Sequence, residues 1–126
     1  MPVNGQPPYD DQNVFARILR NEIPSRRVYE DEWAVAFHDI SPQAPVHILV
    51  VPRGRFVSLT DFAATATEAE IAGFFRAVGI VARELELEQP GYRIVSNIGV
   101  DAGQEVPHLH FHLFGGVRLG TMLVKA

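Results

Sequence analysis

Three of the five histidines of this 126-residue chain occur at every second position, as His108, His110 and His112. In a β-strand the side chains at i, i+2 and i+4 project from one face, so this spacing predicts a row of three imidazoles on one surface. The apolar residues that alternate with them would point to the other face and into a core. Alternate strand residues are about 6.7 Å apart, so the flanking rings could converge on a phosphate-sized group held over the middle ring.

The chemistry of this row allows three interpretations. A polar strand face without function is disfavoured, because histidine is not a preferred strand residue. A zinc site would use the histidines as ligands, but such sites usually add a carboxylate, a thiolate or a further histidine. The chain has no cysteine, and Glu105 lies outside the row. A phosphoryl-transfer site would use one neutral imidazole as nucleophile and its neighbours to hold the phosphate or to move protons. We favour this last interpretation and predict no metal and no cofactor.

The segment before the histidines is typical of a phosphate site that lacks cationic ligands. Between Arg93 and Arg118 the chain contains no lysine or arginine, so a phosphate here would be bound by imidazoles, by Asn97 and by backbone N–H groups. Residues 97–105 include two glycines, and a glycine-containing loop can turn consecutive amides inward around an anion.

Two long motifs resemble one known family. Residues 103–116 read Gly-Gln-Glu-Val-Pro-His-Leu-His-Phe-His-Leu-Phe-Gly-Gly and resemble the signature of the histidine triad (HIT) family. Residues 37–52 read Phe-His-Asp-Ile-Ser-Pro-Gln-Ala-Pro-Val-His-Ile-Leu-Val-Val-Pro. This second block resembles the branch of histidine triad nucleotide-binding proteins, or purine nucleoside phosphoramidases. The resemblance extends from about Val14 to about Leu123.

The resemblance implies a reaction and a role for each histidine. By this resemblance His110 attacks the α-phosphate of a nucleotide and forms a nucleotidyl-histidine, which water then hydrolyses. His112 would hold a phosphate oxygen or pass a proton, while His108 and His47 would orient the set. His47 lies within an apolar run, where a hydrogen-bonded core histidine is the alternative.

The resemblance also implies where the nucleotide binds. Asp39 would accept both ribose hydroxyls, as carboxylates do in other nucleotide sites, although a turn or cap role before Ser41 is the alternative. Apolar side chains would grip the purine, although each could equally belong to the core. Glu105 departs from relatives that carry Ser or Thr there, and a carboxylate beside an anion costs energy unless it turns away. The predicted substrate-binding residues are Phe15, Ile18, Ile23, Phe37, His38, Asp39, Ile40, Asn97, Gly103, Gln104, Glu105 and Val106.

Composition and charge restrict the remaining classes of function. The chain is 47% hydrophobic with a net charge of −4, which is typical of one globular domain. Basic residues form no run beyond Arg26 and Arg27, so we expect no nucleic-acid and no membrane partner. The lack of cysteine, of a secretion signal and of a long apolar run leads us to expect a cytoplasmic protein. We expect a flexible tail over residues 1–11 and a single HIT domain over residues 12–126.

Periodicity predicts the elements of that domain. Apolar residues at helical spacing predict a short helix over residues 12–20 and a long helix from about 67 to 87, the latter opened by the capping-box pattern Thr67-x-x-Glu70. Strands are expected over residues 28–29, 33–37, 46–51 and 92–97, and at the histidines. The fold class is therefore α+β, with a mainly antiparallel five-stranded sheet and one long and one short helix. The resemblance to the HIT family implies the same HIT-like fold.

The resemblance to the HIT family implies a homodimeric hydrolase that cleaves the P–N bond of AMP- or GMP-amines. A dinucleoside polyphosphate hydrolase is the nearest alternative enzyme. A nucleotide-binding regulator without catalytic activity is an alternative of a different class.

Overall fold

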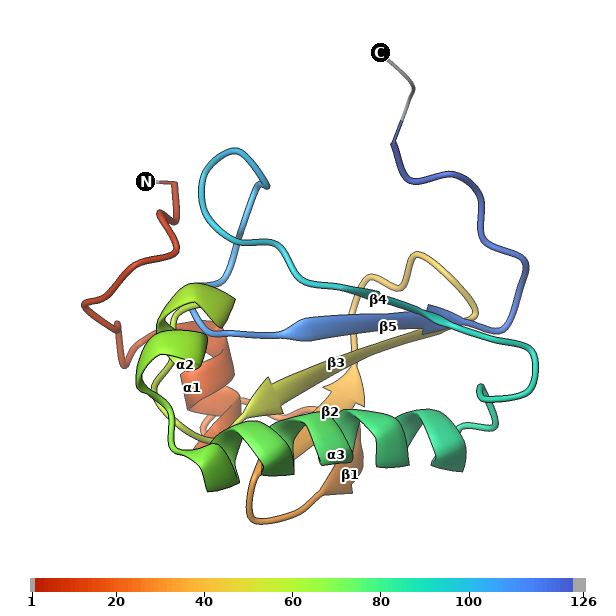
Figure 1. The fold of residues 1–126 in the computed structure, drawn as a ribbon, viewed down its shortest axis with the longest axis horizontal. Coiled ribbons are helices and arrows are strands. Elements are labelled where there is room, and N and C mark those ends of the chain that lie inside the picture. Colours follow the sequence, from red (N-terminus) through yellow and green to blue (C-terminus); the bar gives the residue numbers. More distant parts are fainter. Residues whose placement is uncertain (1, 124–126) are drawn as a thin grey trace.

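The computed structural model describes residues 2–123, and Figure 1 shows the arrangement of the helices and strands in this part of the chain. The elements in chain order are α1 (Val14–Leu19), β1 (Arg27–Glu30), β2 (Ala34–His38), β3 (Val46–Pro52), α2 (Leu59–Thr65), α3 (Glu68–Glu84), β4 (Arg93–Val95) and β5 (Phe111–Gly115). All strand pairs are antiparallel, in the order β1-β2-β3-β5-β4. The predicted α+β class and five-stranded sheet are confirmed.

The two faces of the sheet carry different clusters of side chains. On β3, Ile48 and Val50 belong to the large core cluster with α3, whereas Leu49 and Val51 belong to a smaller cluster with α1. Paired residues of an antiparallel ladder share a face, so His112, which pairs with Leu49, lies on the α1 side. Helix α3 runs across the opposite face of the sheet (Figure 1). The sheet therefore separates the apolar core under α3 from the face that carries chemistry.

The long helix α3 forms as the sequence pattern predicts. Thr67 is its N-cap, and Glu70 completes the capping box by accepting from the Thr67 backbone N–H. Its apolar stripe, including Phe74, packs in one core cluster with Leu113 of β5, the strand that carries His112. Phe75 is less buried than Phe74, with 48% of its surface exposed.

The structure contains a third helix, α2, that we did not predict. Its seven residues offer little apolar periodicity, since only Phe62 among its apolar side chains is buried. The sequence signal that could have revealed it is Ser58-x-x-Asp61, whose side chains and backbone N–H groups form a reciprocal capping box. Within residues 2–123, none of the helices combines the length and the apolar character that crossing a membrane requires.

The N-terminal segment, for which we expected a flexible tail, makes specific contacts with distant parts of the chain. The Ser58 hydroxyl donates to the Gly5 carbonyl at 2.8 Å. The guanidinium of Arg55 donates two hydrogen bonds of 2.9 Å to the Asp11 carboxylate. These contacts are polar and link residues far apart in the sequence, so apolar periodicity gives no sign of them. Residue 1 of the predicted tail and residues 124–126 of the predicted domain lie outside the described residues.

Candidate active site

The three histidines of the motif do not form one exposed row. Strand β5 begins at Phe111, so His112 lies in the ladder and His108 and His110 lie in the segment before it. His108 is fully buried and His110 is 7% exposed. The expectation that both flanking rings converge on a phosphate is wrong for His108, because protein encloses its ring.

The hydrogen bonds of His108 determine its tautomer. Its Nε2 atom lies 2.8 Å from the Pro52 carbonyl oxygen, which can only accept, so Nε2 carries the proton. Burial lowers the pKa of His108 to about 4, so the ring is neutral near pH 7 and Nδ1 is unprotonated. The hydroxyl of Tyr9, 2.5 Å from Nδ1, is therefore the donor in that contact. Sequence reasoning missed Tyr9, because nothing in the pattern of the tail singles it out.

His110 is held in the opposite tautomer. Its Nδ1 atom lies 2.7 Å from the His108 carbonyl oxygen, so Nδ1 carries the proton. Burial lowers the pKa of His110, so Nε2 presents an unprotonated lone pair. The ring of Phe15 packs edge-on against it with a centroid separation of 4.9 Å. Ser96, a residue that sequence reasoning also missed, donates to the His110 carbonyl oxygen at 3.0 Å. Nε2 of His110 is thus available as a nucleophile.

His47 fixes the state of His112. The backbone N–H of Gln43 donates to His47 Nδ1 at 3.1 Å, so the proton of neutral His47 is on Nε2. That Nε2 lies 2.9 Å from Nδ1 of His112, which must accept, and His112 therefore carries its own proton on Nε2. Burial, aided by the neighbouring histidines His110 and His47, lowers the pKa of His112 to about 4. The structure thus places His47 against His112, the last of the three histidines in the motif.

The site therefore combines a lone pair and a proton donor on adjacent neutral rings. The ring centroids of His110 and His112 are 5.1 Å apart. Each tautomer follows from a chain of hydrogen bonds that ends on a backbone group, either a carbonyl or an N–H, whose direction cannot reverse. This arrangement can attack an electrophilic phosphorus with one ring and bind its oxygen with the other.

Asp39 fulfils the turn role that we considered as its alternative, and it also reaches the histidines. Its Oδ1 atom accepts from the Ser41 backbone N–H at 2.7 Å. Its Oδ2 atom lies 3.4 Å from Nε2 of His47. A carboxylate has about four acceptor positions, so the turn does not exhaust its capacity for a ribose. Ile40, next in the chain, is 98% exposed and lines no cluster.

The apolar candidates for a purine slot lie together on the α1 side of the sheet. Phe15, Ile18 and Phe37 are 3–7% exposed and belong to the smaller core cluster, and Ile23 packs against it. Their main role is therefore in the core, and only the small exposed part of each side chain is available to a ligand. His38 pairs with Ile48, so strand alternation places its ring on the α3 side, away from the other histidines.

The glycine-containing loop is closed on itself rather than open around an anion. Gly99 and Gly103 have φ of +79° and +70°, which glycine adopts without strain. The N–H groups of Gly103 and Gln104 donate to the carbonyls of Val100 and Gly99. The side chain of Gln104 accepts from Gly99 N–H and donates to the carbonyls of Val57 and Val106.

These bonds correct the predicted role of the loop residues. The amides of Gly103 and Gln104 are occupied, and so is the Gln104 side chain, which is a structural clamp. Among the residues that the structure describes, the backbone N–H groups of Glu105 and Val106 have no intramolecular acceptor. Glu105 is exposed and Asn97 is half-buried. The amides after the glycines are therefore the better candidates for anion contact.

One group of residues has the composition of a metal site. Ligand atoms of Asp39, His47 and His112 lie within 4.8 Å of one another. Two nitrogen ligands of a tetrahedral zinc are about 3.3 Å apart, so an ion would have to replace the 2.9 Å hydrogen bond between the two rings. The three residues fit zinc with one open position only if that bond is broken.

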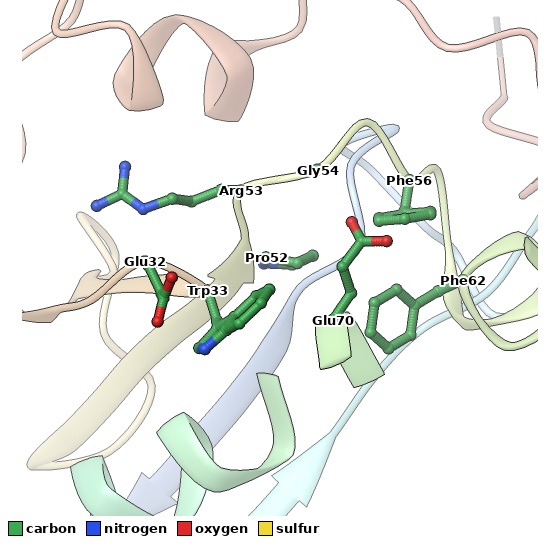
Figure 2. Close-up of a pocket in the computed structure, with 8 residues that line it drawn as sticks. All are labelled: Glu32, Trp33, Pro52, Arg53, Gly54, Phe56, Phe62 and Glu70. Atoms are coloured by element: carbon green, nitrogen blue, oxygen red, sulfur yellow. The ribbon is translucent and has the colours of Figure 1, made fainter. Parts of the chain in front are cut away.

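Two cavities lie outside the histidine cluster. Figure 2 shows the first, of about 100 Å³, in which the Trp33 ring and the Glu70 carboxylate lie on either side of Pro52. The Glu70 carboxylate already accepts from the Thr67 backbone N–H in the capping box of α3. The second, of about 270 Å³, lies beside Tyr9 and is lined mainly by arginines and α1. Neither lining includes a histidine, so we assign the chemistry to the histidines and not to these cavities.

Known proteins resemble this chain over most of its length. A family model described as HIT domain matches residues 20–119. An uncharacterized 13.2 kDa HIT-like protein of Azospirillum brasilense is 66% identical over 117 residues, covering 93% of this chain and 96% of that protein. The purine nucleoside phosphoramidase of Escherichia coli K12 is 40% identical over 113 residues, covering 90% and 94%. A 14 kDa zinc-binding protein of Zea mays is 44% identical over 108 residues, covering 85% and 84%.

The fold also matches solved structures. A HIT family hydrolase from Clostridium thermocellum superposes with a TM-score of 0.81 at 38% identity, covering 91% of this chain and 99% of that one. This likeness confirms the HIT-like fold that the two motifs led us to expect.

Proposed function

Because the chain belongs to the HIT family, we propose that it is a hydrolase that cleaves the P–N bond of purine nucleoside 5′-phosphoramidates. Its substrates would be AMP or GMP joined to an amine. The observation that carries the proposal is the pair of neutral rings, in which an unprotonated Nε2 of His110 lies beside an N–H donor of His112. The name of the relative from Escherichia coli supports the substrate class.

The first chemical step uses His110. Its Nε2 lone pair attacks the α-phosphorus, the P–N bond breaks, and the electron pair leaves with the amine nitrogen, which takes up a proton. The nucleotidyl ring then carries a positive charge. Its Nδ1–H stays on the His108 carbonyl oxygen, 2.7 Å away, and this carbonyl dipole stabilises the charge.

The proton for the amine comes through His112. A neutral imidazole N–H is a weak acid and is better suited to binding a phosphate oxygen. A bound phosphate places negative charge beside the ring and raises the pKa of His112. His112 then takes up a second proton at Nδ1 while the Nε2–H of His47 turns to the Asp39 carboxylate, whose Oδ2 lies 3.4 Å away. The imidazolium of His112 protonates the leaving amine from Nε2. Neutral His112 then accepts the proton of the water that attacks the nucleotidyl-histidine. The products are the nucleoside monophosphate, the amine and the original ring of His110.

The nucleotide would lie across the α1 side of the sheet. We propose that the free acceptor positions of Asp39 bind the ribose hydroxyls, and that the amides of Glu105 and Val106 bind the phosphate. The edges of Phe15, Phe37 and Ile23 would contact the purine without base-specific hydrogen bonds, so discrimination between adenine and guanine should be weak.

We propose that two copies associate through the exposed edge strand β4. Within residues 2–123 this strand pairs with β5 alone, so its outer backbone groups are available to a second sheet. Ile94 pairs with Leu113 on the α3 side and is 44% exposed, and Phe75 of α3 is 48% exposed on the same side. A charged residue in place of Ile94 should reduce the apparent mass in analytical ultracentrifugation to that of a monomer.

One panel of substrates separates this proposal from its alternatives. Purified protein should release amine from adenosine and guanosine phosphoramidates at least ~100-fold faster than it cleaves dinucleoside polyphosphates. Preferred cleavage of the polyphosphates would establish the alternative enzyme. Tight nucleotide binding without turnover of either class would establish a binding module.

A further inference from the structure

Tyr9 connects the N-terminal segment to the centre of the site. Its hydroxyl lies 2.5 Å from Nδ1 of His108, across 99 residues of sequence, and the two rings pack edge-on with centroids 5.6 Å apart. The contact is part-buried, and His108 itself is fully buried. Tyr9 is thus a donor within the protein, aimed at a ring that solvent does not reach.

The segment that carries Tyr9 is attached on both sides. Before it, the Gly5 carbonyl accepts from the Ser58 hydroxyl, and after it, Asp11 pairs with Arg55. The guanidinium carbon of Arg55 also lies 5.3 Å from the centre of the Tyr9 ring, within the range of a cation–π contact. These contacts fix the position of a side chain that would otherwise belong to a mobile terminus.

We propose that Tyr9 is a positioning residue for His110 and acts through His108. Its hydroxyl donates to Nδ1 of His108 and so keeps that ring in the tautomer that donates to the Pro52 carbonyl. With its ring held at both nitrogens, His108 keeps its own carbonyl in place for the Nδ1–H of His110. This chain of hydrogen bonds leaves the lone pair of His110 on Nε2.

Burial supports the direction of the first bond. Desolvation is the largest influence on the Tyr9 phenol and raises its pKa, so the hydroxyl is protonated and able to donate throughout the neutral range. Without it, Nδ1 of a buried ring would have no donor, and an unsatisfied buried acceptor is costly. Without this donor, protonation of His108 at Nδ1, or transfer of its proton from Nε2 to Nδ1, would become more favourable.

The test uses Tyr9→Phe in the full chain, with Tyr29→Phe as the matched control. Tyr29 also gives one hydroxyl hydrogen bond, to Asp31 at 2.8 Å, and lies in β1 outside the site. The inference rests on the proposed function, so the first readout is turnover of an adenosine phosphoramidate. We expect kcat to fall about fivefold to tenfold in Tyr9→Phe, the equivalent of one buried hydrogen bond, with KM within about twofold. Tyr29→Phe should retain the kcat of the wild type.

A second readout does not depend on activity. In nitrogen-15 NMR of the wild type, His108 should show a protonated Nε2 and an unprotonated Nδ1 down to low pH. In Tyr9→Phe we expect the pKa of His108 to rise measurably, or Nδ1 to become protonated. Because Tyr9 acts through His108, the losses in kcat of Tyr9→Phe and His108→Gln must also fail to add.

The outcomes distinguish this inference from the proposed function. A fall in kcat with a changed His108 state only in Tyr9→Phe supports the positioning role. An unchanged His108, or an effect on KM alone, or an equal loss in Tyr29→Phe, would overturn it. If the wild type turns over no phosphoramidate, the proposed function fails, and the state of His108 in the two variants still decides whether Tyr9 controls that ring.

Discussion

Nε2 of His47 lies 2.9 Å from Nδ1 of His112, although 65 residues separate the two in the sequence. The Gln43 backbone N–H, bound to the other nitrogen of His47, gives this contact its direction. As a result, a loop amide next to β3 determines which nitrogen of His112 carries the proton on β5. The position of the donated proton on His112 is therefore set by contacts that form only when β3 and β5 pair in the sheet.

Replacement of His110 tests the nucleophile. His110→Ala removes the lone pair that attacks phosphorus, so kcat should fall by about three orders of magnitude or more, while nucleotide affinity stays within about tenfold. Rapid-quench kinetics and nucleotide binding by calorimetry give the two numbers. Turnover close to that of the wild type would remove His110 from this role.

Replacement of His47 tests the control of His112. His47→Ala removes the donor to His112 Nδ1, so His112 can place its proton on either nitrogen, and we expect kcat to fall about tenfold. The matched control is His38→Ala, because His38 lies on the α3 side of the sheet. Its kcat should stay within about twofold of the wild type. Equal losses in both variants would contradict a specific effect of His47.

Asp39 can be tested independently of the histidines. If its carboxylate binds the ribose hydroxyls, Asp39→Ala should weaken binding of a ribonucleotide by about 1.5–3 kcal/mol. A 2′,3′-dideoxy nucleotide already lacks these bonds, so the variant should lose little further affinity for it. Calorimetry with both nucleotides measures the four affinities. Additive losses would leave Asp39 with only the turn role that its bond to Ser41 shows.

Removal of metal should leave the reaction intact. Imidazoles and amides stabilise charge in the proposed mechanism, so protein treated with EDTA should keep its kcat within about twofold. Added zinc should inhibit, because an ion held by Asp39, His47 and His112 would displace the hydrogen bond between the two rings. Loss of activity on chelation that zinc restores would establish a metal enzyme instead.

Acid should destabilise the fold before the carboxylates titrate. The pKa of His108 is about 4 in the folded chain and about 6.5 in an unfolded one. Above pH 6.5 neither state is protonated, and His108 has no effect. Below it, only the unfolded chain takes up the proton, so the free energy of unfolding should fall by about 3 kcal/mol as the pH approaches 4. Urea unfolding between pH 7.5 and 4.5 measures this, and a flat profile down to pH 5 would contradict it.

The sequence alone determined the elements that depend on local spacing. Thr67 and Glu70 stand at capping-box spacing, and the apolar residues after them recur at the helical period, so α3 could be predicted. The alternation around His112 likewise predicted which side chains enter the core. The two motifs predicted the family, which the comparisons confirm.

Only the tertiary structure decided the state of the site, because hydrogen bonds between distant residues leave no periodic trace in the chain. The spacing predicted a row of three imidazoles on one surface, but His108 is buried, and its ring is bound by the carbonyl of Pro52 and the hydroxyl of Tyr9. The amides of the glycine loop could equally have pointed outward, and the Gln104 side chain closes the loop instead. Local periodicity thus places residues on elements, while the partners that assign each proton come together only when the sheet forms.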